Sequence, residues 1–557
     1  MKNNRWINFT VLFVLIFGSF GMRSSSNHLA VAAPLADEVL YVKPESDGAE
    51  DCTSWDDACE LQDALETALY GDQIWAASGI YTPTHRTDSE DPLSATFEMK
   101  SGVGIYGGFV GSESELAERD WETNITVLSG DLEGNDITDP SGVITDTINI
   151  IGSNVYHVVS SEGVTETAIL DGFNITGGAA DGEDPLLCYE KCGGGMYNVS
   201  SSPVLSNVIF RGNTAFRGGG GMYNEFSSPG LFNVTFSGNM SDNDGGGIYN
   251  LWSAPELSYV TLSGNIANLS GGGMDSHYSD PVLNNVIFDG NKAEYGAGMR
   301  NLYGSQLLSN VNFRSNTADV NGGGIDNAHN SLVMTNVAFD GNLADYYGGG
   351  MDNYNNLIEL TNVTFSGNLA GMDGGGMFNW TSRPVVMTGV TFSGNHADSR
   401  GGGMYNISSP IITNTILWGN TAEEGGHQIY NSDSSFPSIS YSDIQGGCET
   451  IVGNDCSGGG NIDVNPRVLR NPDPGTDGIW GTADDDYGNL RLRPDSPAID
   501  AGDNFAVPEI VNSDMDGNPR FTDILGIPDS GNGTPPIVDI GAYEATFRLV
   551  YLPLITH

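Results

Sequence analysis

A hexapeptide of the type Gly-Gly-Gly-Met-Tyr-Asn, first seen at residues 193–198, constrains the fold of this chain more than any other feature. With substitutions it returns nine times, at steps of 24 to 27 residues and most often 26. A period this short and regular predicts a solenoid or an array, because one such unit cannot bury its apolar face alone. The copies begin at Gly193, Gly219, Gly245, Gly271, Gly296, Gly322, Gly348, Gly374, Gly401 and Gly425.

Each period is too rich in glycine to form a helical repeat, since glycine costs ~1 kcal/mol against alanine inside a helix. Apolar residues instead alternate with period two, as in Val208 and Phe210, which is typical of a strand. Leu205 stands three residues before Val208, and this odd offset requires a bend between the two. We therefore predict three short strands per period, at 193–198, 203–206 and 207–213. Stacked in parallel ~4.8 Å apart, they form a right-handed parallel β-helix.

Two columns of side chains follow from this stacking. The first points into the core: Met196, Met222, Ile248, Met274, Met299, Ile325, Met351, Met377, Met404 and Ile429. The second occupies one corner: Asn213, Asn239, Asn265, Asn291, Asn316, Asn342, Asn368, Asn395 and Asn420. Stacked amides can bond from coil to coil, as in other stacks of identical strands.

The pairing of a Gly-Gly-Gly-hydrophobic block with a Phe-x-x-Asn block, as in Phe210 and Asn213, resembles the repeats of polymorphic outer membrane proteins. More broadly it looks like the pectin-lyase-like β-helix superfamily, over residues 193–431. This resemblance implies the fold but no particular activity, because the fold hosts lyases, hydrolases, adhesins and inert stalks.

The chain begins with a predicted secretory signal at 1–32. Lys2 and Arg5 precede an apolar run at 6–20, and small residues at 30–32 allow cleavage. An uncleaved membrane anchor is the alternative, but the run is shorter than the ~20 apolar residues that a span requires. No later segment is apolar enough to span a bilayer. We therefore expect a protein that is secreted or held at the cell surface.

Six cysteines form three local pairs. In an exported chain such pairs predict disulfides, and no histidines accompany them as a zinc site would require. The pairs are Cys52 with Cys59, Cys188 with Cys192, and Cys448 with Cys456.

Three regions are expected after the signal: an N-terminal cap with irregular coils at 37–192, regular repeats at 193–465, and a C-terminal module at 466–557. A helix at 56–69, with Leu61, Leu65 and Leu69 on one side, is the candidate cap, since an open solenoid end exposes its core and unpaired strands. Residues 463–544 resemble a choice-of-anchor Q domain. The motifs are Asp-Met-Asp-Gly-Asn-Pro-Arg at 514–520 and Val-Asp-Ile-Gly-Ala-Tyr-Glu at 538–544.

The chain has 21 basic and 71 acidic residues, for a net charge of −50. Such a balance disfavours nucleic acids and anionic membranes as partners, and favours divalent cations or a cationic partner. Five carboxylates on a glycine-rich loop predict a calcium site, with a cluster of solvated turn residues as the alternative. They are Asp473, Asp477, Asp484, Asp485 and Asp486.

The column after the inward residues is expected to face outward by alternation. Its aromatic members are predicted to bind ligand, because sugar rings stack on such side chains: Tyr197, Tyr223, Tyr249, Phe378, Tyr405 and Tyr430. Its charged members are the candidate catalytic residues: Asp275, Arg300, Asp326 and Asp352. Neighbouring coils place Asp326 and Asp352 ~5 Å apart and Asp275 and Asp326 ~10 Å apart, which brackets the carboxylate spacings of glycosidases. Solvated acids or a row of ion pairs is the alternative.

Two functions follow from this reading. The favoured one is a secreted or surface-displayed, adhesin-like binding and structural stalk, with polysaccharide or a cell-surface glycan as the ligand. The other is a polysaccharide lyase or glycoside hydrolase that uses the charged residues of the column. The Gly-His-Gly and Arg-Ile-Lys blocks of polygalacturonases and the calcium-plus-arginine set of pectate lyases are not found in the sequence.

Overall fold

The computed structural model describes residues 38–182, 188–380, 383, 385–453, 456, 458–478 and 480–547. All of them belong to one compact unit, Ala36–His557. The predicted signal at 1–32 lies outside the described residues. Within the described part of the chain, no helix is both long and apolar enough to cross a bilayer.

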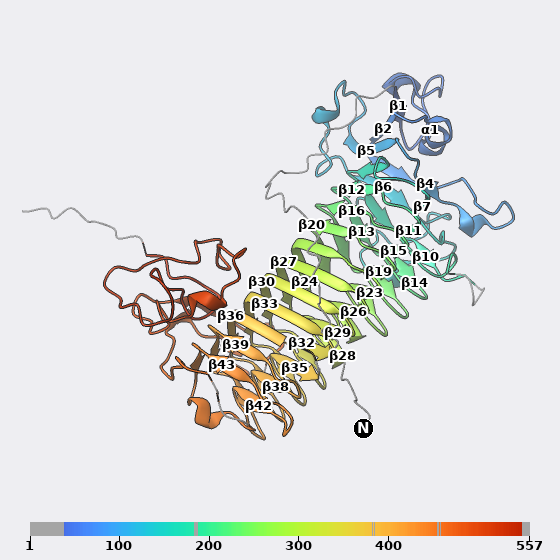
Figure 1. Cartoon of the computed structure of the whole chain (residues 1–557). Helices are drawn as coiled ribbons and strands as arrows, with labels where there is room; N and C mark the ends of the chain where they lie inside the picture. The colour runs from blue at the N-terminus through green and yellow to red at the C-terminus, as the bar shows by residue number, and fades with distance from the viewer. Residues whose placement is uncertain are drawn as a thin grey trace, which may run out of the picture. The chain divides into compact units, whose positions relative to one another are not determined.

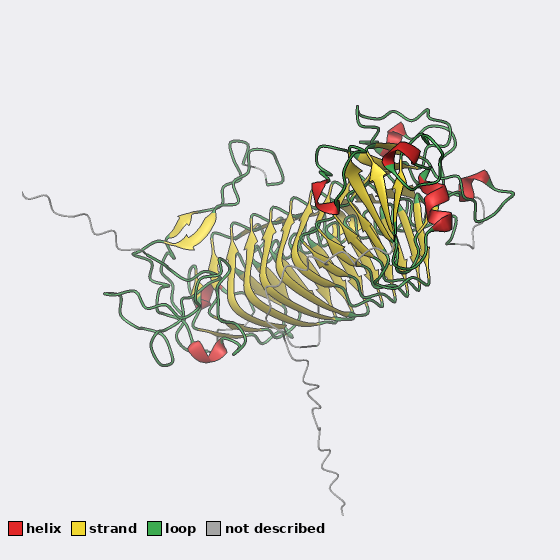
Figure 2. Ribbon diagram, turned by 90° about the horizontal axis from the view of Figure 1, so that it is seen from above, coloured by secondary structure: helices red, strands yellow, loops and turns green. Residues whose placement is uncertain are grey.

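Over these residues the chain forms a parallel β-solenoid, in which strands of successive coils pair in register (Figures 1 and 2). Its first sheet has 12 strands: β4 (Phe97–Glu98), β7 (Val159–Glu162), β11 (Met196–Val199), β15 (Met222–Glu225), β19 (Ile248–Leu251), β23 (Met274–His277), β26 (Met299–Leu302), β29 (Ile325–Ala328), β32 (Met351–Tyr354), β35 (Met377–Trp380), β38 (Met404–Asn406) and β42 (Ile429–Asn431).

The widest sheet has 22 strands, and most coils contribute two of them or one long one. They are β1 (Val39–Val42), β2 (Gln73–Ala77), β3 (Gly79–Tyr81), β5 (Gly104–Phe109), β6 (Thr126–Ser129), β8 (Ile169–Asp171), β9 (Asn174–Thr176), β12 (Val204–Ser206), β13 (Ile209–Arg211), β16 (Gly230–Phe232), β17 (Thr235–Ser237), β20 (Glu256–Ser258), β21 (Thr261–Ser263), β24 (Val282–Asp289), β27 (Ser305–Arg314), β30 (Ser331–Asp340), β33 (Leu357–Ser366), β36 (Val385–Ser393), β39 (Ile411–Thr413), β40 (Ile416–Trp418), β43 (Ser438–Ser440) and β44 (Asp443–Ile444).

The third solenoid sheet has 10 short strands. They are β10 (Ala179–Ala180), β14 (Thr214–Ala215), β18 (Met240–Ser241), β22 (Ile266–Ala267), β25 (Lys292–Tyr295), β28 (Thr317–Asn321), β31 (Leu343–Ala344), β34 (Leu369–Ala370), β37 (His396–Ala397) and β41 (Thr421–Ala422).

The three predicted strands of a period do not form three separate sheets in the structure. The second and third, such as β12 and β13, share the widest sheet and are separated by a bend at Asn207, whose φ is 54°. In later coils they merge into single strands such as β24 and β27. The third side of the coil is instead the dipeptide after the corner asparagine, as at β14. Two residues are too few to give a periodic signal in the sequence.

The core and the corner column agree with the sequence analysis. Met196 pairs with Met222 and is fully buried, and the phenylalanines of successive coils stack, as Phe210 does on Phe236 with centroids 4.7 Å apart. The asparagine ladder is present: the Asn213 Nδ2 donates to the Asn239 Oδ1 at 3.0 Å and to a backbone carbonyl of the coil before. Each buried amide thus bonds the coils on both sides of it.

Asn291→Ala is expected to lower the free energy of unfolding by about 1–3 kcal/mol, because it leaves buried hydrogen-bonding groups unpaired. The Asn291 Oδ1 accepts bonds from the backbone and the side-chain amide of Asn265, and the Asn291 Nδ2 donates to the Leu262 carbonyl. Denaturant titration measures the loss. The exposed Asn268→Ala is the matched control, expected to stay within ~0.5 kcal/mol; equal losses would contradict a stabilising role of the ladder.

The predicted helix at 56–69 is shorter in the structure. The α-helix α1 spans Leu61–Thr67, while Trp55–Asp57 forms the separate 3-10 turn η1, and Leu69 is 72% exposed. The chain between them is held extended because Cys59 bridges to Val42 of β1 and is disulfide-bonded to Cys52. The other 3-10 turns are η2 (Pro92–Ser94), η3 (Leu116–Glu118), η4 (Thr147–Asn149), η5 (Cys448–Thr450) and η6 (Asn504–Ala506).

All three predicted disulfides are confirmed. The Cα–Cα distances are 4.8 Å for Cys52–Cys59, 5.2 Å for Cys188–Cys192 and 5.5 Å for Cys448–Cys456. These distances lie inside the usual range for disulfides.

The C-terminal residues form a loop-rich segment with the antiparallel pair β45 (Val468–Arg470) and β46 (Asn489–Leu492). Their own small core includes Ile416 of the solenoid. The segment lies against the widest sheet: the Asn362 Nδ2 donates to the Ser513 carbonyl at 2.8 Å, and the Ala542 N–H donates to the Thr391 Oγ1 at 3.2 Å.

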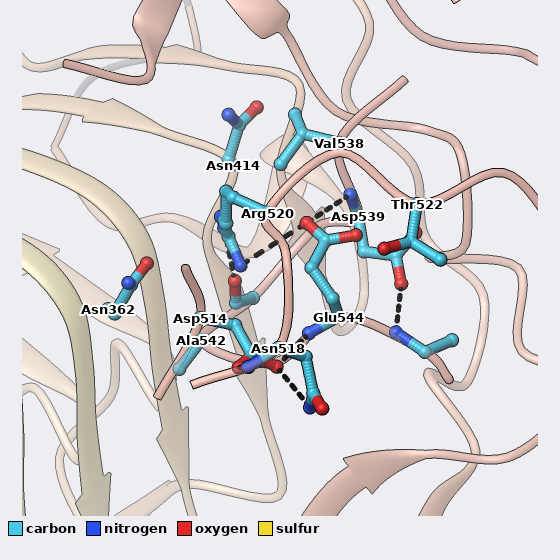
Figure 3. Close-up of polar contacts among 12 residues, drawn as sticks. Asn362, Asn414, Asp514, Asn518, Arg520, Thr522, Val538, Asp539, Ala542 and Glu544 are labelled. Atoms are coloured by element: carbon cyan, nitrogen blue, oxygen red, sulfur yellow. Dashed lines mark hydrogen bonds and ion pairs between the residues drawn. The ribbon is translucent and has the colours of Figure 1, made fainter. Parts of the chain in front are cut away.

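The motifs at 514–520 and 538–544 form one buried network in this segment (Figure 3). The Arg520 Nη2 donates to the Gly541 carbonyl at 2.8 Å, and Nη1 lies 3.4 Å from the Glu544 Oε1. The Glu544 N–H donates to the Asp514 Oδ2 at 2.8 Å, and the Ala545 N–H donates to the Asp539 Oδ2 at 2.7 Å. The polar residues of both motifs therefore hold the segment together.

Candidate functional site

The column after the inward residues runs in unbroken register from Tyr197 to Tyr430. The expectation that it faces solvent is wrong for its carboxylates, because Asp275, Asp326 and Asp352 are between 0% and 8% exposed. Tyr223, Phe378 and Tyr405 are buried too. The side chains do point away from the core cluster, so something else in each coil covers them.

A second column, immediately before the glycine block, provides that cover. It is a ladder of β-bridges through Asp244, Ser270 and Tyr295 in the middle coils and Tyr347, Asp373 and Arg400 further on. The Ser270 hydroxyl donates to the Asp275 Oδ2 at 2.5 Å. The Arg400 guanidinium lies 5.0 Å from the Tyr405 ring centroid. The corner of the coil thus folds over the predicted site and encloses it.

Four acids, one arginine and one histidine meet in the middle of this enclosed row. The His277 Nε2 lies 3.1 Å from the Asp275 Oδ1, and the Arg300 Nε lies 3.4 Å from the Asp326 Oδ2. The Ser270 hydroxyl also contacts the Asp244 Oδ1 at 2.5 Å. The alternative of a cross-strand row of ion pairs therefore describes Asp275, Arg300 and Asp326 well.

Burial and pairing together give these acids different pKa values. It raises the pKa of Asp326 to about 6, although Arg300 opposes the shift. Burial, and then the Asp326 charge, raise the pKa of Asp352 well above its ordinary value. Burial also opposes ionisation of Asp275, but His277 and Arg300 outweigh it and lower its pKa. The enclosed row thus holds more carboxylates than cations to pair with them.

The aromatic members of the column stack on one another. Tyr197 and Tyr223 lie 5.4 Å apart at 7°, and Tyr405 and Tyr430 lie 5.1 Å apart at 5°. Phe378 stacks between Tyr405 and Tyr347, and Tyr249 stacks on Tyr223. A ring face covered by a neighbouring ring is not free to stack on a sugar. The ligand-binding role of these six residues stays a prediction.

A second aromatic column, which the sequence analysis missed, is exposed. Its residues stand four positions after the inward residue of successive coils, and this constant offset is the signal that could have found them. Phe226, Trp252, Tyr278 and Tyr303 are between 39% and 56% exposed. Successive centroids lie 5.0, 5.9 and 4.9 Å apart, and His329 follows Tyr303 at 5.1 Å.

Two further exposed rings lie next to the end of this column, although they stand three positions, not four, after the inward residues Met351 and Met377. Tyr354 lies 5.0 Å from His329 with its ring turned by 83°, and Trp380 lies 5.8 Å from Tyr354 at 73°. We call the complete set the aromatic ridge: Phe226, Trp252, Tyr278, Tyr303, His329, Tyr354 and Trp380. It follows the carboxyl-terminal end of the 12-stranded sheet from β15 to β35.

The first five ridge residues adopt a left-handed backbone, with φ from 48° to 58°. For a bulky side chain this conformation costs roughly 1–2 kcal/mol, whereas asparagine visits it readily. Asn355 occupies the equivalent position in the next coil with φ 57°. At the other bend of the coil, asparagines fill most such positions, as at Asn285, Asn310 and Asn336. The aromatic residues are therefore not what the backbone of this corner favours.

The acidic loop at 473–486 uses its carboxylates in turns. The Asp484 Oδ2 accepts bonds from the Thr476 N–H and hydroxyl, and the Asp485 Oδ2 accepts one from the Gly481 N–H. The Asp486 Oδ2 pairs with Arg470. Within the described part of the chain, no group of three or more His, Cys, Asp or Glu residues is placed to hold a metal ion. Calcium binding by this loop stays a prediction.

Two surface hollows lie away from these features. One of about 370 Å³ is lined by residues such as Tyr259, Ile287 and Asn310 on the widest sheet. The other, of about 470 Å³, lies beside α1 and is lined by Asp51, Asp63 and other residues.

The parallel sheets and the coil of about 26 residues define the class of this protein as a parallel β-solenoid. The Chlamydia polymorphic membrane protein repeat matches residues 233–251, which is less than one coil. Among solved structures, pectate lyase Pel9A is similar at 13% identity, covering 92% of this chain and 97% of that one with a TM-score of 0.30. Comparison with curated proteins gave no match. None of these comparisons shows a choice-of-anchor Q domain, and none carries an argument about activity.

Proposed function

We propose that this protein is an exported, adhesin-like β-solenoid that binds polysaccharide and does not cleave it. The burial of the candidate catalytic acids carries the proposal. A general acid or base must come within hydrogen-bond distance of the group on which it acts. Asp275, Asp326 and Asp352 are at most 8% exposed, which leaves little of their surface for a glycosidic bond to contact.

Two observations support export and surface display. Three disulfides fit an oxidising compartment, since cytosolic thiols are kept reduced. The repeat matched at 233–251 carries the name of a membrane protein family, and the sequence begins with a predicted signal. The proposal includes a right-handed coil and a C-terminal module similar to a choice-of-anchor Q domain.

The solenoid architecture suits a stalk. Each coil contacts mainly its neighbours, so length is gained by adding coils without rebuilding a core. At the N-terminal end, Leu61 and Leu65 of α1 join the same apolar cluster as Leu40 of β1 and Ile74 of β2. We include in the proposal that α1 caps this end.

Incubation with a panel of plant and microbial glycans is expected to give retention without cleavage. Retention is measured by affinity electrophoresis, and cleavage by the appearance of new reducing ends or unsaturated sugar products. The enclosed position of the acids is the physical reason for the second half of this expectation.

Turnover of any glycan would overturn the proposal in favour of a lyase or hydrolase. In that case Asp275→Asn, Asp326→Asn and Asp352→Asn would identify the residues that act. Absence of both retention and turnover over the whole panel would remove the binding part of the proposal.

A further inference from the structure

We propose that the aromatic ridge is the ligand-binding face, and that it takes a neutral, extended polysaccharide lying along the solenoid axis. This inference rests on the binding function proposed above and adds a site and a ligand class to it.

The backbone at the ridge indicates that the rings are there for something other than folding. Trp252 and Tyr278 adopt left-handed φ values of 48° and 50°, where asparagine is easier to place. Asn355 continues the same corner one coil beyond His329 with φ 57°. Strained backbone positions cluster at binding sites and switches, so an observed outlier is a reason to look for function.

The chemistry of the exposed groups suits a sugar. Each ring has an apolar body, and every ridge residue except Phe226 carries a polar tip. Among the described residues, the Tyr278 and Tyr303 hydroxyls and the Trp252 indole N–H have no hydrogen-bond partner in the protein, whereas the His329 Nδ1 lies 3.2 Å from the Asn355 Nδ2. Side chains that join an apolar surface to a polar tip bind ligands that are partly apolar and partly hydroxylated.

The negative charge of the chain restricts the expected ligands to neutral polymers. The net charge of −50 repels polyanions and a second copy of this chain alike. The residues that directly follow the first five rings are uncharged: Ser227, Ser253, Ser279, Gly304 and Asn330. None of these five residues is a cation that could recognise a uronate or a phosphate; the basic groups beside them are the imidazoles of His277, which pairs with Asp275, and of the ridge residue His329.

The spacing of the rings indicates a polymer that advances by one unit per coil. Centroids of the first five rings recur every 4.9 to 5.9 Å along the axis. An extended chain of equatorially linked pyranoses advances by a similar length per sugar, whereas α-linked chains wind into helices. Because the stacked rings cover one another's faces, such a chain would contact their electropositive edges with its oxygens.

The test uses hydroxyethyl cellulose as the extended neutral probe, with soluble amylose and polygalacturonate beside it. We expect the double variant Trp252→Asn and Tyr278→Asn to bind hydroxyethyl cellulose at least tenfold more weakly in affinity electrophoresis. Its melting temperature should change little, because asparagine suits the left-handed backbone. Tyr259→Asn is the matched control, since Tyr259 is also exposed with φ 57° but lies at the other bend. It is expected to bind as the unaltered protein does.

The outcomes separate this inference from the function on which it rests. Hydroxyethyl cellulose binding that survives the double variant overturns the ridge as the site and leaves the binding function standing. Preferential binding of amylose or polygalacturonate overturns the ligand class. If no glycan of the panel is retained, the binding function itself is overturned. If the double variant unfolds, Tyr303→Asn alone repeats the test at one ring, and unchanged binding there counts against the ridge.

Discussion

Arg520→Met is expected to lower the free energy of unfolding of the C-terminal segment by about 3–5 kcal/mol, because one partner of a buried ion pair is removed. Arg520 and Glu544 are almost fully buried, and their charged atoms lie 3.4 Å apart. Burial and the nearby Asp539 raise the pKa of Glu544 well above its ordinary value, against the effect of Arg520. Without the guanidinium, Glu544 must lie uncompensated in the interior or take up a proton.

Denaturant titration combined with amide hydrogen exchange of residues 490–545 measures this loss. Arg491→Met is the matched control, because Arg491 pairs with Asp516 at the surface, where such a pair contributes about 0–1 kcal/mol. The double variant Arg520→Met and Glu544→Leu should recover much of the stability, since replacing both partners by apolar groups is often neutral. Equal losses for the two single variants would contradict the account.

The same arginine explains an interruption in the solenoid. Gly389, with φ 62°, stands at the bend in the widest sheet, where other coils have Asn336, Asn362 and Asn414. A Cβ at this glycine would lie 2.5 Å from the Arg520 Nη2. A glycine is therefore required where the C-terminal segment packs on the coil. The sequence could not predict this, because the two residues are more than a hundred positions apart and no repeat links them.

The solenoid itself could be predicted because every coil repeats the same pattern of glycine, apolar and asparagine residues. Met196 above Met222 and Asn213 beside Asn239 follow from the period alone. The third sheet could not, because strands such as β14 and β18 have two residues each and no alternation to detect. Helix α1 was predicted too long because a disulfide and a β-bridge keep Cys59 extended.

The candidate site shows where periodicity stops being informative. Alternation correctly places Asp275 and Asp326 away from the core cluster, but it does not say what lies over them. Their cover comes from Ser270 and its counterparts, a few residues earlier in the same coil. The main part of the aromatic ridge could have been predicted from the sequence, since Phe226, Trp252 and Tyr278 share one offset from the inward column. The exposure of side chains in stacked polar and aromatic columns can therefore be assigned only when the cross-section of the coil is known.

The double variant Asp326→Asn and Asp352→Asn is expected to raise the stability of the solenoid at pH 8 by at least about 3 kcal/mol, which is the contribution of Asp326 alone at ~1.4 kcal/mol per unit of pKa shift. Burial raises the pKa of Asp326 to about 6 from an ordinary value of 3.8, and it raises that of Asp352 well above its ordinary value. At pH 8 Asp326 is ionised in an enclosed row where Arg300 pairs with it and not with Asp352. An asparagine carries no charge to desolvate there.

The sign of this effect fixes its pH dependence. A carboxyl with a raised folded pKa binds more protons in the folded state, so its contribution to stability is greatest below pH 3.8 and is lost as pH rises through about 6. The gain from the double variant should therefore shrink towards zero at pH 4, and melting temperatures from pH 4 to pH 8 measure it. Asp345→Asn, at an exposed acid of the same region, should change stability by less than ~0.5 kcal/mol at every pH. A double variant that is less stable than the unaltered protein at pH 8 would mean that the ionised acids are held by contacts stronger than the Arg300 pair.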